Sequence, residues 1–235
     1  MSTDAAAAPT AREEVLRRIR AANAAAGAAA APVPPVPRDY ATAGTLSPGS
    51  PGVLDLLEDR LADYQARVTR CSAAEVPAAV GAALRSVIGA ADTGHERRVV
   101  VPAGLPRHWV LHWGTTEADG EVTVVVDDGA LSWSELDAMS AVVTAATVAA
   151  AVTGTIVLDA RPDQGRRALS LVPDLHLCVV RADQVVQTVP EAVARLEATR
   201  PLTWISGPSA TSDIELNRVE GVHGPRTLEV LLVTG

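Results

Sequence analysis

Short apolar runs rich in β-branched residues alternate with helical segments from residue 45 to the end of the chain. The runs typical of strands are 67–70, RVVV at 98–101, 122–126, AVVT at 141–144, TIVL at 155–158, LHLCVV at 175–180, WIS at 204–206 and LEVLLV at 228–233. Such runs indicate strands buried on both faces, and helices between them indicate a parallel sheet. We therefore predict an α/β fold with a mostly parallel sheet of about eight or nine strands, in a single domain over residues 45–235.

Helical periodicity occupies the intervals between these strands. Residues 53–68 place Leu54, Leu57, Leu61 and Tyr64 on one face, which predicts an amphipathic helix that runs into the first strand. A second helix is predicted over 74–90, with Pro77 in the first turn, where proline is tolerated. A third is expected near 190–198.

The stretch Ala138–Leu158 carries no charged residue and is long enough to cross a bilayer. Its composition changes, however, from β-branched AVVT to Ala-rich ATVAAAV and then, after a turn, to TIVL. We predict a buried strand, a short helix and a second strand rather than a membrane-spanning helix.

The N-terminal segment has a different character. Residues 11–24 have apolar side chains at helical spacing, and the PVPPVPRDY stretch that follows is a stiff linker. Arginines before the Ala-rich run imitate a twin-arginine export signal, but Glu13 and Glu14 interrupt its basic region and alanine is too weakly apolar for its hydrophobic part. We expect a helix and a Pro/Ala-rich linker over residues 1–44, and a cytoplasmic protein.

The charge balance argues against a nucleic-acid partner. The formal net charge is −8, and the 20 basic residues, all arginine, are scattered rather than gathered in a stripe that could neutralise a phosphate backbone. The absence of lysine also excludes Schiff-base catalysis and a phosphate loop of the GKS/T type.

Cysteines, histidines and acids form no recognisable metal motif. Cys71 and Cys178 lie far apart and outside any CxxC pair, so the sequence predicts no iron–sulfur cluster in this chain. His108 and His112 have the spacing of a helical zinc pair, but the flanking proline and glycine leave barely two turns and no HExxH pattern is present. The corner at 127–129 reads as a turn after a strand rather than a divalent-cation site. We therefore expect no metal site.

Two turns that combine glycine with hydroxyls are the strongest candidates for anion binding. They are Thr153–Thr155 and Gly207–Asp213, and the second directly follows the WIS strand. Because ligands of open α/β sheets bind beyond the carboxyl ends of the strands, we expect both turns at that edge. The ligand-binding candidates in and beside them are Thr153, Gly154, Thr155, Ser206, Gly207, Ser209, Thr211, Asp213 and His223.

The same C-terminal stretch allows a catalytic interpretation. Ser209, His223 and either Asp213 or Glu215 have the residue types of a serine-hydrolase triad. The GPSAT sequence, however, lacks the second glycine of a GxSxG nucleophile elbow. We therefore assign no catalytic residue.

A capped helix over Asp213–Glu220 is the structural interpretation. Ser212 and Glu215 form a capping-box pattern, and Gly221 stands where a helix C-terminal glycine belongs. This helix accounts for half of the polar residues in the stretch. It leaves Ser206, Ser209, Thr211 and His223 for a ligand.

Two adjacent arginines add a further candidate. Arg166 or Arg167 could hold a carboxylate with a bidentate guanidinium if it faces the same crevice as Thr153–Thr155. An exposed arginine at the start of a helix is the alternative.

The order and spacing of four segments resemble a known family. They are TGTIVLD (153–159), RRALSLVPDLHLCVV (166–180), WISGPSATSDIE (204–215) and GVHGPRTLEVLLV (221–233). Together with LEDRLADYQARV, they resemble the lactate-utilization protein C (LutC) family of stand-alone LUD domains. The ISGPSxTxDIE and GVHGP elements are specific, and the resemblance covers nearly the whole chain.

The resemblance implies a fold similar to the NagB/RpiA/CoA-transferase group, a Rossmann-like three-layer sandwich. It also implies a non-redox subunit that works with two iron–sulfur partner proteins, LutA-like and LutB-like, in oxidising L-lactate to pyruvate. No catalytic activity of the subunit itself follows from it. A stand-alone enzyme acting on an acyl-CoA, sugar phosphate or folate-like substrate is the alternative, by analogy of fold alone.

Two positions depart from the family pattern. Val152 stands before TGT, where family members often carry an acidic or polar residue, and Ala210 stands where they often carry a larger polar or basic one. Any ligand here must rely on backbone N–H groups, Ser209, Thr211 and Arg167.

Overall fold

The computed structural model describes residues 10–27, 35–88, 97–113, 122–211, 219–220 and 224–235. By its internal contacts the chain divides into two units, Met1–Tyr40 and Ala41–Gly235. The first unit contains one helix, α1 (Ala11–Gly27), none of whose residues is buried. All other elements belong to the second unit.

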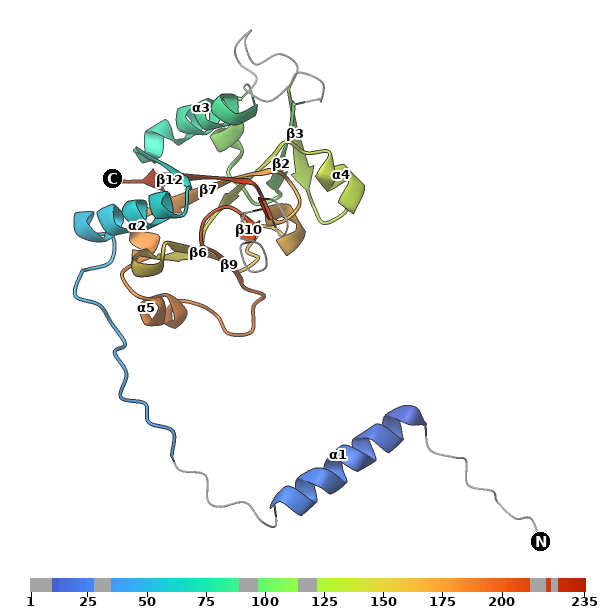
Figure 1. The fold of residues 1–235 in the computed structure, drawn as a ribbon. Helices are drawn as coiled ribbons and strands as arrows, with labels where there is room; N and C mark the ends of the chain where they lie inside the picture. The colour runs from blue at the N-terminus through green and yellow to red at the C-terminus, as the bar shows by residue number, and fades with distance from the viewer. Residues whose placement is uncertain (1–9, 28–34, 89–96, 114–121, 212–218, 221–223) are drawn as a thin grey trace. The chain divides into compact units, whose positions relative to one another are not determined.

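A six-stranded parallel sheet forms the centre of the second unit (Figure 1). In spatial order its strands are β1 (Arg67–Cys71), β12 (Thr227–Val233), β7 (Leu175–Arg181), β4 (Ala141–Ala145), β2 (Arg97–Pro102) and β3 (Val122–Asp127). Each was expected from its apolar run. The predicted α/β fold with a mostly parallel sheet is confirmed.

Two helices cover opposite faces of this sheet, α2 (Pro51–Asp63) and α3 (Val76–Ile88) (Figure 1). Successive residues of β7 alternate between them: Leu177 packs in the core with α3, and Cys178 packs in the core with α2. The sheet is thus the middle layer of a sandwich. Tyr64, expected on the apolar face of the first helix, instead lies just beyond α2 and is exposed.

The start of α3 is set by a local hydrogen-bond motif. A 3-10 turn (Ala73–Glu75) precedes it, and the Ser72 N–H donates to Glu75 Oε2 at 2.8 Å. The helix ends at Ile88. Residues 89–90, included in the predicted helix, lie outside the described part of the chain.

A second, four-stranded sheet lies beside α2. Its strands, in spatial order, are β8 (Val185–Val186), β5 (Val148–Ala150), β6 (Thr155–Leu158) and β9 (Thr203–Ile205), and α5 (Val189–Ala194) packs on it. Strand β6 runs antiparallel to both β5 and β9. The TIVL and WIS runs are therefore strands, as expected, but belong to this sheet rather than to the parallel one.

The predicted short helix between AVVT and TIVL is wrong. The Ala-rich segment forms β5, followed by a 3-10 turn (Ala151–Thr153). Ala149 packs in the core with α2 and Ala150 in the core with α5, and β5 pairs with β6 and β8. Burial on both faces and strand pairing on both sides override the helix propensity of alanine.

The C-terminal stretch also differs from the expectation. Strand β11 (Val219–Glu220) pairs antiparallel with β10 (Ala210–Thr211), so the predicted helix does not extend to Glu220. Its capping box at 212–215 lies outside the described residues. One short helix that we did not predict, α4 (Trp133–Asp137), is started by Ser132, which accepts from the Glu135 N–H.

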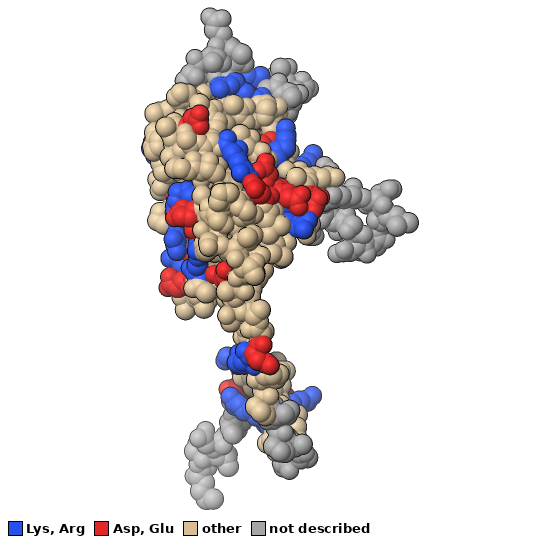
Figure 2. Space-filling view, turned by 90° about the vertical axis from the view of Figure 1, so that its left-hand side faces the viewer, with Lys and Arg blue, Asp and Glu red and all other residues tan. Residues whose placement is uncertain are grey.

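Among the described residues, no helix is both long and apolar enough to span a bilayer. The uncharged stretch 138–158 is instead divided among strands β4, β5 and β6. On the face shown in Figure 2, basic and acidic side chains are interspersed rather than arranged in a basic stripe. Arg70, for example, forms ion pairs with Asp55 and Glu58.

Candidate functional site

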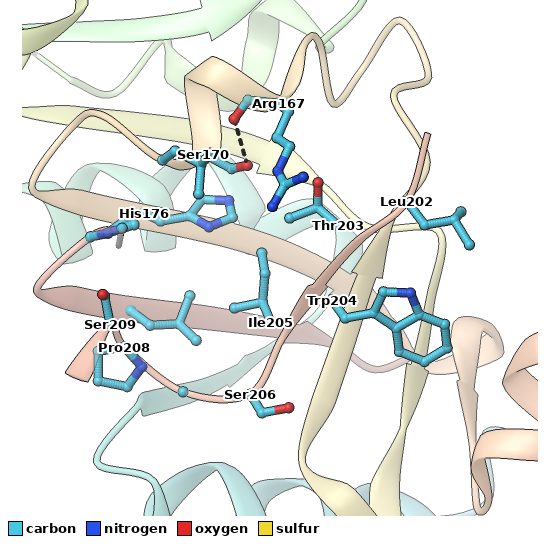
Figure 3. A pocket seen from close by; sticks show the side chains of 15 residues that line it. Arg167, Ser170, His176, Leu202, Thr203, Trp204, Ile205, Ser206, Pro208 and Ser209 are labelled. Carbon is cyan, nitrogen blue, oxygen red and sulfur yellow. Dashed lines mark hydrogen bonds between the residues drawn. The ribbon is translucent and has the colours of Figure 1, made fainter. Parts of the chain in front are cut away.

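A cavity of about 460 Å³ lies at the edge of the six-stranded sheet where the parallel strands begin (Figure 3). His176 and Leu228, the second residues of β7 and β12, line it, together with strand β9, the loop Gly207–Ser209 and the 3-10 turn Arg167–Ser170. We call it the amino-edge cavity. Its volume falls in the range of about 300–1,000 Å³ typical of small-molecule sites.

The two adjacent arginines considered from the sequence have opposite environments. Arg166 donates from Nε and Nη2 to the two carboxylate oxygens of Asp127, at 2.9 and 3.1 Å, and this ion pair raises the pKa of its guanidinium. Arg167 lines the amino-edge cavity and is exposed. Within the described ranges its guanidinium makes no hydrogen bond or ion pair. Arg167, not Arg166, is therefore the guanidinium available to a ligand.

A buried histidine that sequence analysis did not single out lies at the cavity wall. His176 is 1% exposed, and its Nε2 lies 2.8 Å from Thr144 Oγ1. Burial lowers its pKa to about 4, so the imidazole is neutral at physiological pH. In Figure 3, its ring and the Arg167 guanidinium lie near each other at one side of the cavity. The histidine supplies a neutral hydrogen-bonding group beside a cation.

A hydroxyl chain joins the two predicted turns behind this cavity. Thr155 Oγ1 lies 2.8 Å from Ser206 Oγ and donates to Thr153 Oγ1 at 2.8 Å. Only Ser206 of the three lines the cavity. Gly154, at φ 55°, makes the left-handed turn between the two threonines. The Thr153–Thr155 turn thus supports the cavity wall rather than lining it.

The Gly207–Ser209 corner meets Gly224 and Pro225 at the cavity. The Ser209 N–H donates to Pro225 O at 2.8 Å, and Ser209, Gly207 and Gly224 all line the cavity. Gly207 has φ 83°, and a Cβ there would lie 2.6 Å from Tyr64 Cβ, so the position requires glycine. Thr211 takes part in β10, while Asp213 and His223 lie outside the described residues.

The expected location of these turns was wrong. Thr153–Thr155 leads into β6, whose first residue is Thr155, and Gly207 follows β9; both strands belong to the four-stranded sheet. The cavity they help to build faces the beginnings of β7 and β12 rather than the ends of the parallel strands. The rule about carboxyl ends failed here because the two runs were assigned to the wrong sheet.

The cysteines pack on opposite faces of the six-stranded sheet. Cys71 belongs to the core with α3 and Cys178 to the core with α2. Burial raises the pKa of both thiols, that of Cys178 to about 12. The two sulfurs cannot reach a common ligand from these positions.

The remaining polar candidates have structural contacts. His108 lies in a 3-10 turn (Arg107–Val110) with its ring edge-on to Trp109, and the His112 carbonyl accepts from Arg85 Nη1. Asp127 is buried and bound by Arg166. No cluster of three or more His, Cys, Asp or Glu side chains suited to a metal ion occurs in the described part of the chain.

Comparison with known proteins places the cavity within a characterised domain type. A profile of the LUD domain matches residues 133–233, which include every lining residue of the amino-edge cavity. A crystal structure of a DUF162 family protein from Deinococcus radiodurans is 45% identical, with a TM-score of 0.61, over 80% of this chain and 99% of that one. The chain contains a LUD domain.

Similar full-length proteins identify the family more narrowly than the domain profile does. The lactate utilization protein C of Deinococcus radiodurans is 54% identical over 77% of this chain and 79% of its own length. The protein of the same name from Bacillus pumilus is 38% identical over 35% of this chain and 38% of its own. The chain belongs to the lactate utilization protein C family, as the resemblance implied.

Proposed function

We propose that this protein takes part in L-lactate utilization as a non-redox subunit, and that its amino-edge cavity binds a small organic anion. The role in lactate utilization is supported by the names of its relatives. The iron–sulfur partners remain a prediction from the family resemblance, and the cytoplasmic location remains a prediction from the sequence. The burial of Cys71 and Cys178 on opposite sides of the sheet supports a chain that leaves electron transfer to those partners.

The anion assignment rests on Arg167. Its guanidinium has no acidic partner within the described ranges, and the described lining of the cavity contains no acid. Hydroxyl groups of Ser170, Thr203 and Ser209 also line the cavity and can hydrogen-bond to a hydroxyl or keto oxygen. A planar guanidinium with neutral groups around it fits the carboxylate of a hydroxy or keto acid.

The volume constrains the ligand further. The cavity has room for more than a three-carbon acid, so we expect lactate itself to occupy only part of it. Arg167 is exposed, and an exposed ion pair contributes about 0–1 kcal/mol. Binding of L-lactate alone should therefore be weak.

Thermal unfolding with L-lactate, pyruvate and larger carboxylates tests the anion site. Because a ligand that binds only the folded state raises the melting temperature, we expect stabilisation by at least one carboxylate and its loss in Arg167→Gln. Arg181→Gln is the control, since Arg181 is similarly exposed but pairs with Asp183 away from the cavity. Equal stabilisation of both variants, or none of the wild type, contradicts the anion site.

Genetics and co-purification test the pathway separately. Deleting the gene should abolish growth on L-lactate, and the tagged chain should recover iron–sulfur proteins. Unimpaired growth on L-lactate would disprove the role whatever the cavity binds. Turnover of an acyl-CoA or sugar phosphate by the purified chain alone would instead favour the stand-alone enzyme.

A further inference from the structure

A second cavity, of about 540 Å³, lies at the opposite edge of the six-stranded sheet. Its lining includes Ala103, which follows β2, and the Asp127–Gly129 corner at the end of β3. We call it the carboxyl-edge cavity. The segment 160–166 covers the strand ends: Gly104 N–H donates to Pro162 O at 2.8 Å, and Ala145 N–H donates to Asp163 O at 3.1 Å.

The strand order places this cavity where ligands of α/β sheets bind. Strands β2 and β4 are neighbours, but the chain continues from β2 to β3 on one side and from β4 to β7 on the other. Such a divergence leaves a crevice beyond the carboxyl ends of the two strands. The amino-edge cavity does not lie at such a crevice, because it faces the beginnings of the parallel strands.

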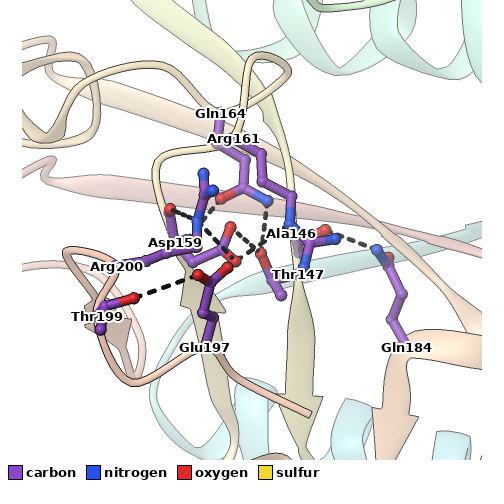
Figure 4. Close-up of polar contacts among 9 residues, drawn as sticks. All are labelled: Ala146, Thr147, Asp159, Arg161, Gln164, Gln184, Glu197, Thr199 and Arg200. Carbon is purple, nitrogen blue, oxygen red and sulfur yellow. Dashed lines mark hydrogen bonds and ion pairs between the residues drawn. The ribbon is translucent and has the colours of Figure 1, made fainter.

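Two arginines at this cavity share a single carboxylate (Figure 4). Arg161 Nε lies 3.1 Å and Arg200 Nε 3.4 Å from Asp159 Oδ2, and Arg200 Nε also donates to the Asp159 carbonyl at 2.9 Å. Both arginines line the cavity, and their side chains are 50% and 32% exposed. These two guanidinium groups therefore share one buried carboxylate, while Arg166 in the same lining pairs with Asp127.

The terminal nitrogen atoms of both guanidinium groups remain available. The hydrogen bonds that Arg161 and Arg200 donate to described residues come from Nε, and none comes from their terminal amino groups. Arg166, which lines the same cavity, differs because its Nε and Nη2 are both bonded to Asp127. Arg161 and Arg200 are held in place yet keep their outer donors.

A buried polar network holds the shared carboxylate in position. The Asp159 side chain is fully buried and accepts from Thr147 Oγ1 at 2.7 Å. Gln164, also buried, accepts from the Asp159 N–H and donates to Thr147 Oγ1, both at 2.7 Å. Both arginines are therefore held by a carboxylate that is itself fixed by buried hydrogen bonds.

The backbone between the carboxylate and Arg161 adopts an unusual conformation. Ala160 lines the cavity with φ 57°, a left-handed conformation unfavourable for a residue with a Cβ. Residues retained in such conformations concentrate at ligand sites, where the surrounding structure holds them. The left-handed Ala160 is thus a third feature, after the two arginines and the crevice, that indicates a ligand site in the carboxyl-edge cavity.

We propose that the carboxyl-edge cavity binds a phosphate group, as a free ion or as part of a phosphorylated metabolite, between Arg161 and Arg200. Two guanidinium groups offer more terminal N–H donors than the two oxygens of one carboxylate need, and a phosphate presents a third acceptor and a second charge. Asp128, which also lines the cavity, disfavours an anion beside it, so we expect the phosphate next to the arginines.

Titration of the full chain with inorganic phosphate by calorimetry, at constant ionic strength, tests this site. We expect saturable binding to the wild type and at least tenfold weaker binding to both Arg161→Gln and Arg200→Gln. Arg226→Gln is the matched control, because Arg226 is exposed near the start of β12 and lies 3.7 Å from Asp174.

Ala103→Leu is a second test, which does not depend on whether the arginine variants fold correctly. It narrows the cavity while leaving both ion pairs with Asp159 in place, so phosphate binding should weaken at least tenfold with an unchanged melting temperature in the absence of ligand. Absence of binding to the wild type overturns the proposal, as does equal binding by wild type and Ala103→Leu. A phosphorylated metabolite as the natural ligand predicts tighter binding of sugar phosphates than of free phosphate.

Discussion

The arginines at the two edges of the six-stranded sheet differ in their ion pairs. At the carboxyl edge, Arg161, Arg166 and Arg200 are all anchored by buried carboxylates. At the amino edge, Arg167 has no described acidic partner, and its neighbours are hydroxyls and a neutral histidine. An arginine at a cavity can thus be held in place by a buried carboxylate, as at the carboxyl edge, or have no described acidic partner, as Arg167 does at the amino edge.

Removing the shared carboxylate should produce the largest effect. Asp159→Ala leaves Thr147 without its acceptor and two arginines without a counter-charge, so we expect a loss of about 3–5 kcal/mol in the free energy of unfolding. Urea unfolding measures it. Asp183→Ala, which removes the exposed partner of Arg181, should cost less than about 1 kcal/mol. A similar cost for both variants would show that the carboxyl edge is not rigidly held.

The neutral histidine at the amino edge should make stability depend on pH. Because its folded-state pKa, about 4, lies below the unfolded value of 6.5, the unfolded state gains a proton first as the pH falls. The free energy of unfolding should therefore decrease from pH 6.5 to pH 4, by about 3 kcal/mol in total.

Unfolding of wild type and His176→Gln across this pH range isolates that contribution. Glutamine can keep the hydrogen bond to Thr144 Oγ1 but does not titrate, so the difference between the two proteins should shrink at low pH. Parallel pH profiles would mean that His176 is protonated at its ordinary pKa in the folded protein.

The turn at Gly207 offers a smaller perturbation of the amino edge. Gly207→Ala adds both left-handed strain and a contact with Tyr64 Cβ at 2.6 Å, and should cost about 2 kcal/mol. Gly129→Ala, at φ 102° with no atom within 4 Å of the added Cβ, reports strain alone and should cost about 1 kcal/mol. Equal decreases in melting temperature for the two variants would show that the contact with Tyr64 does not add to the cost at Gly207.

The smallest effect is expected in the hydroxyl chain. Thr155→Val removes the contact with Ser206 Oγ while keeping the shape of the side chain, so we expect a loss of about 1 kcal/mol. Thr155→Ser should restore most of it. Thermal unfolding measures both, and a loss shared by Thr155→Ser would show that the methyl group, not the hydroxyl, matters.

Periodicity was a sound guide to the main sheet and to helices α1, α2 and α3. It failed for β5, because alanine favours a helix until burial between two cores and pairing on both sides decide otherwise. Periodicity also failed to assign the strands to two separate sheets, because an apolar run predicts a strand but not which strand it pairs with.

The candidate site was predicted in part. Ser206, Gly207, Ser209 and Arg167 line one cavity, as residues marked by turn chemistry and charge can do. His176 was missed because the LHLCVV run reads as an ordinary buried strand. A histidine within an otherwise apolar buried strand was the available signal.

The sequence by itself determined the α/β class, the family and the residues that can contact an anion, because these follow from local pattern and residue chemistry. Only the tertiary structure decided which of two adjacent arginines has an acidic partner among the described residues. Arg166 and Arg167 are adjacent and chemically identical, but the backbone directs one to Asp127, 39 residues away in sequence, and the other to the amino-edge cavity. Long-range partners set the role of a side chain, and the local sequence does not encode them.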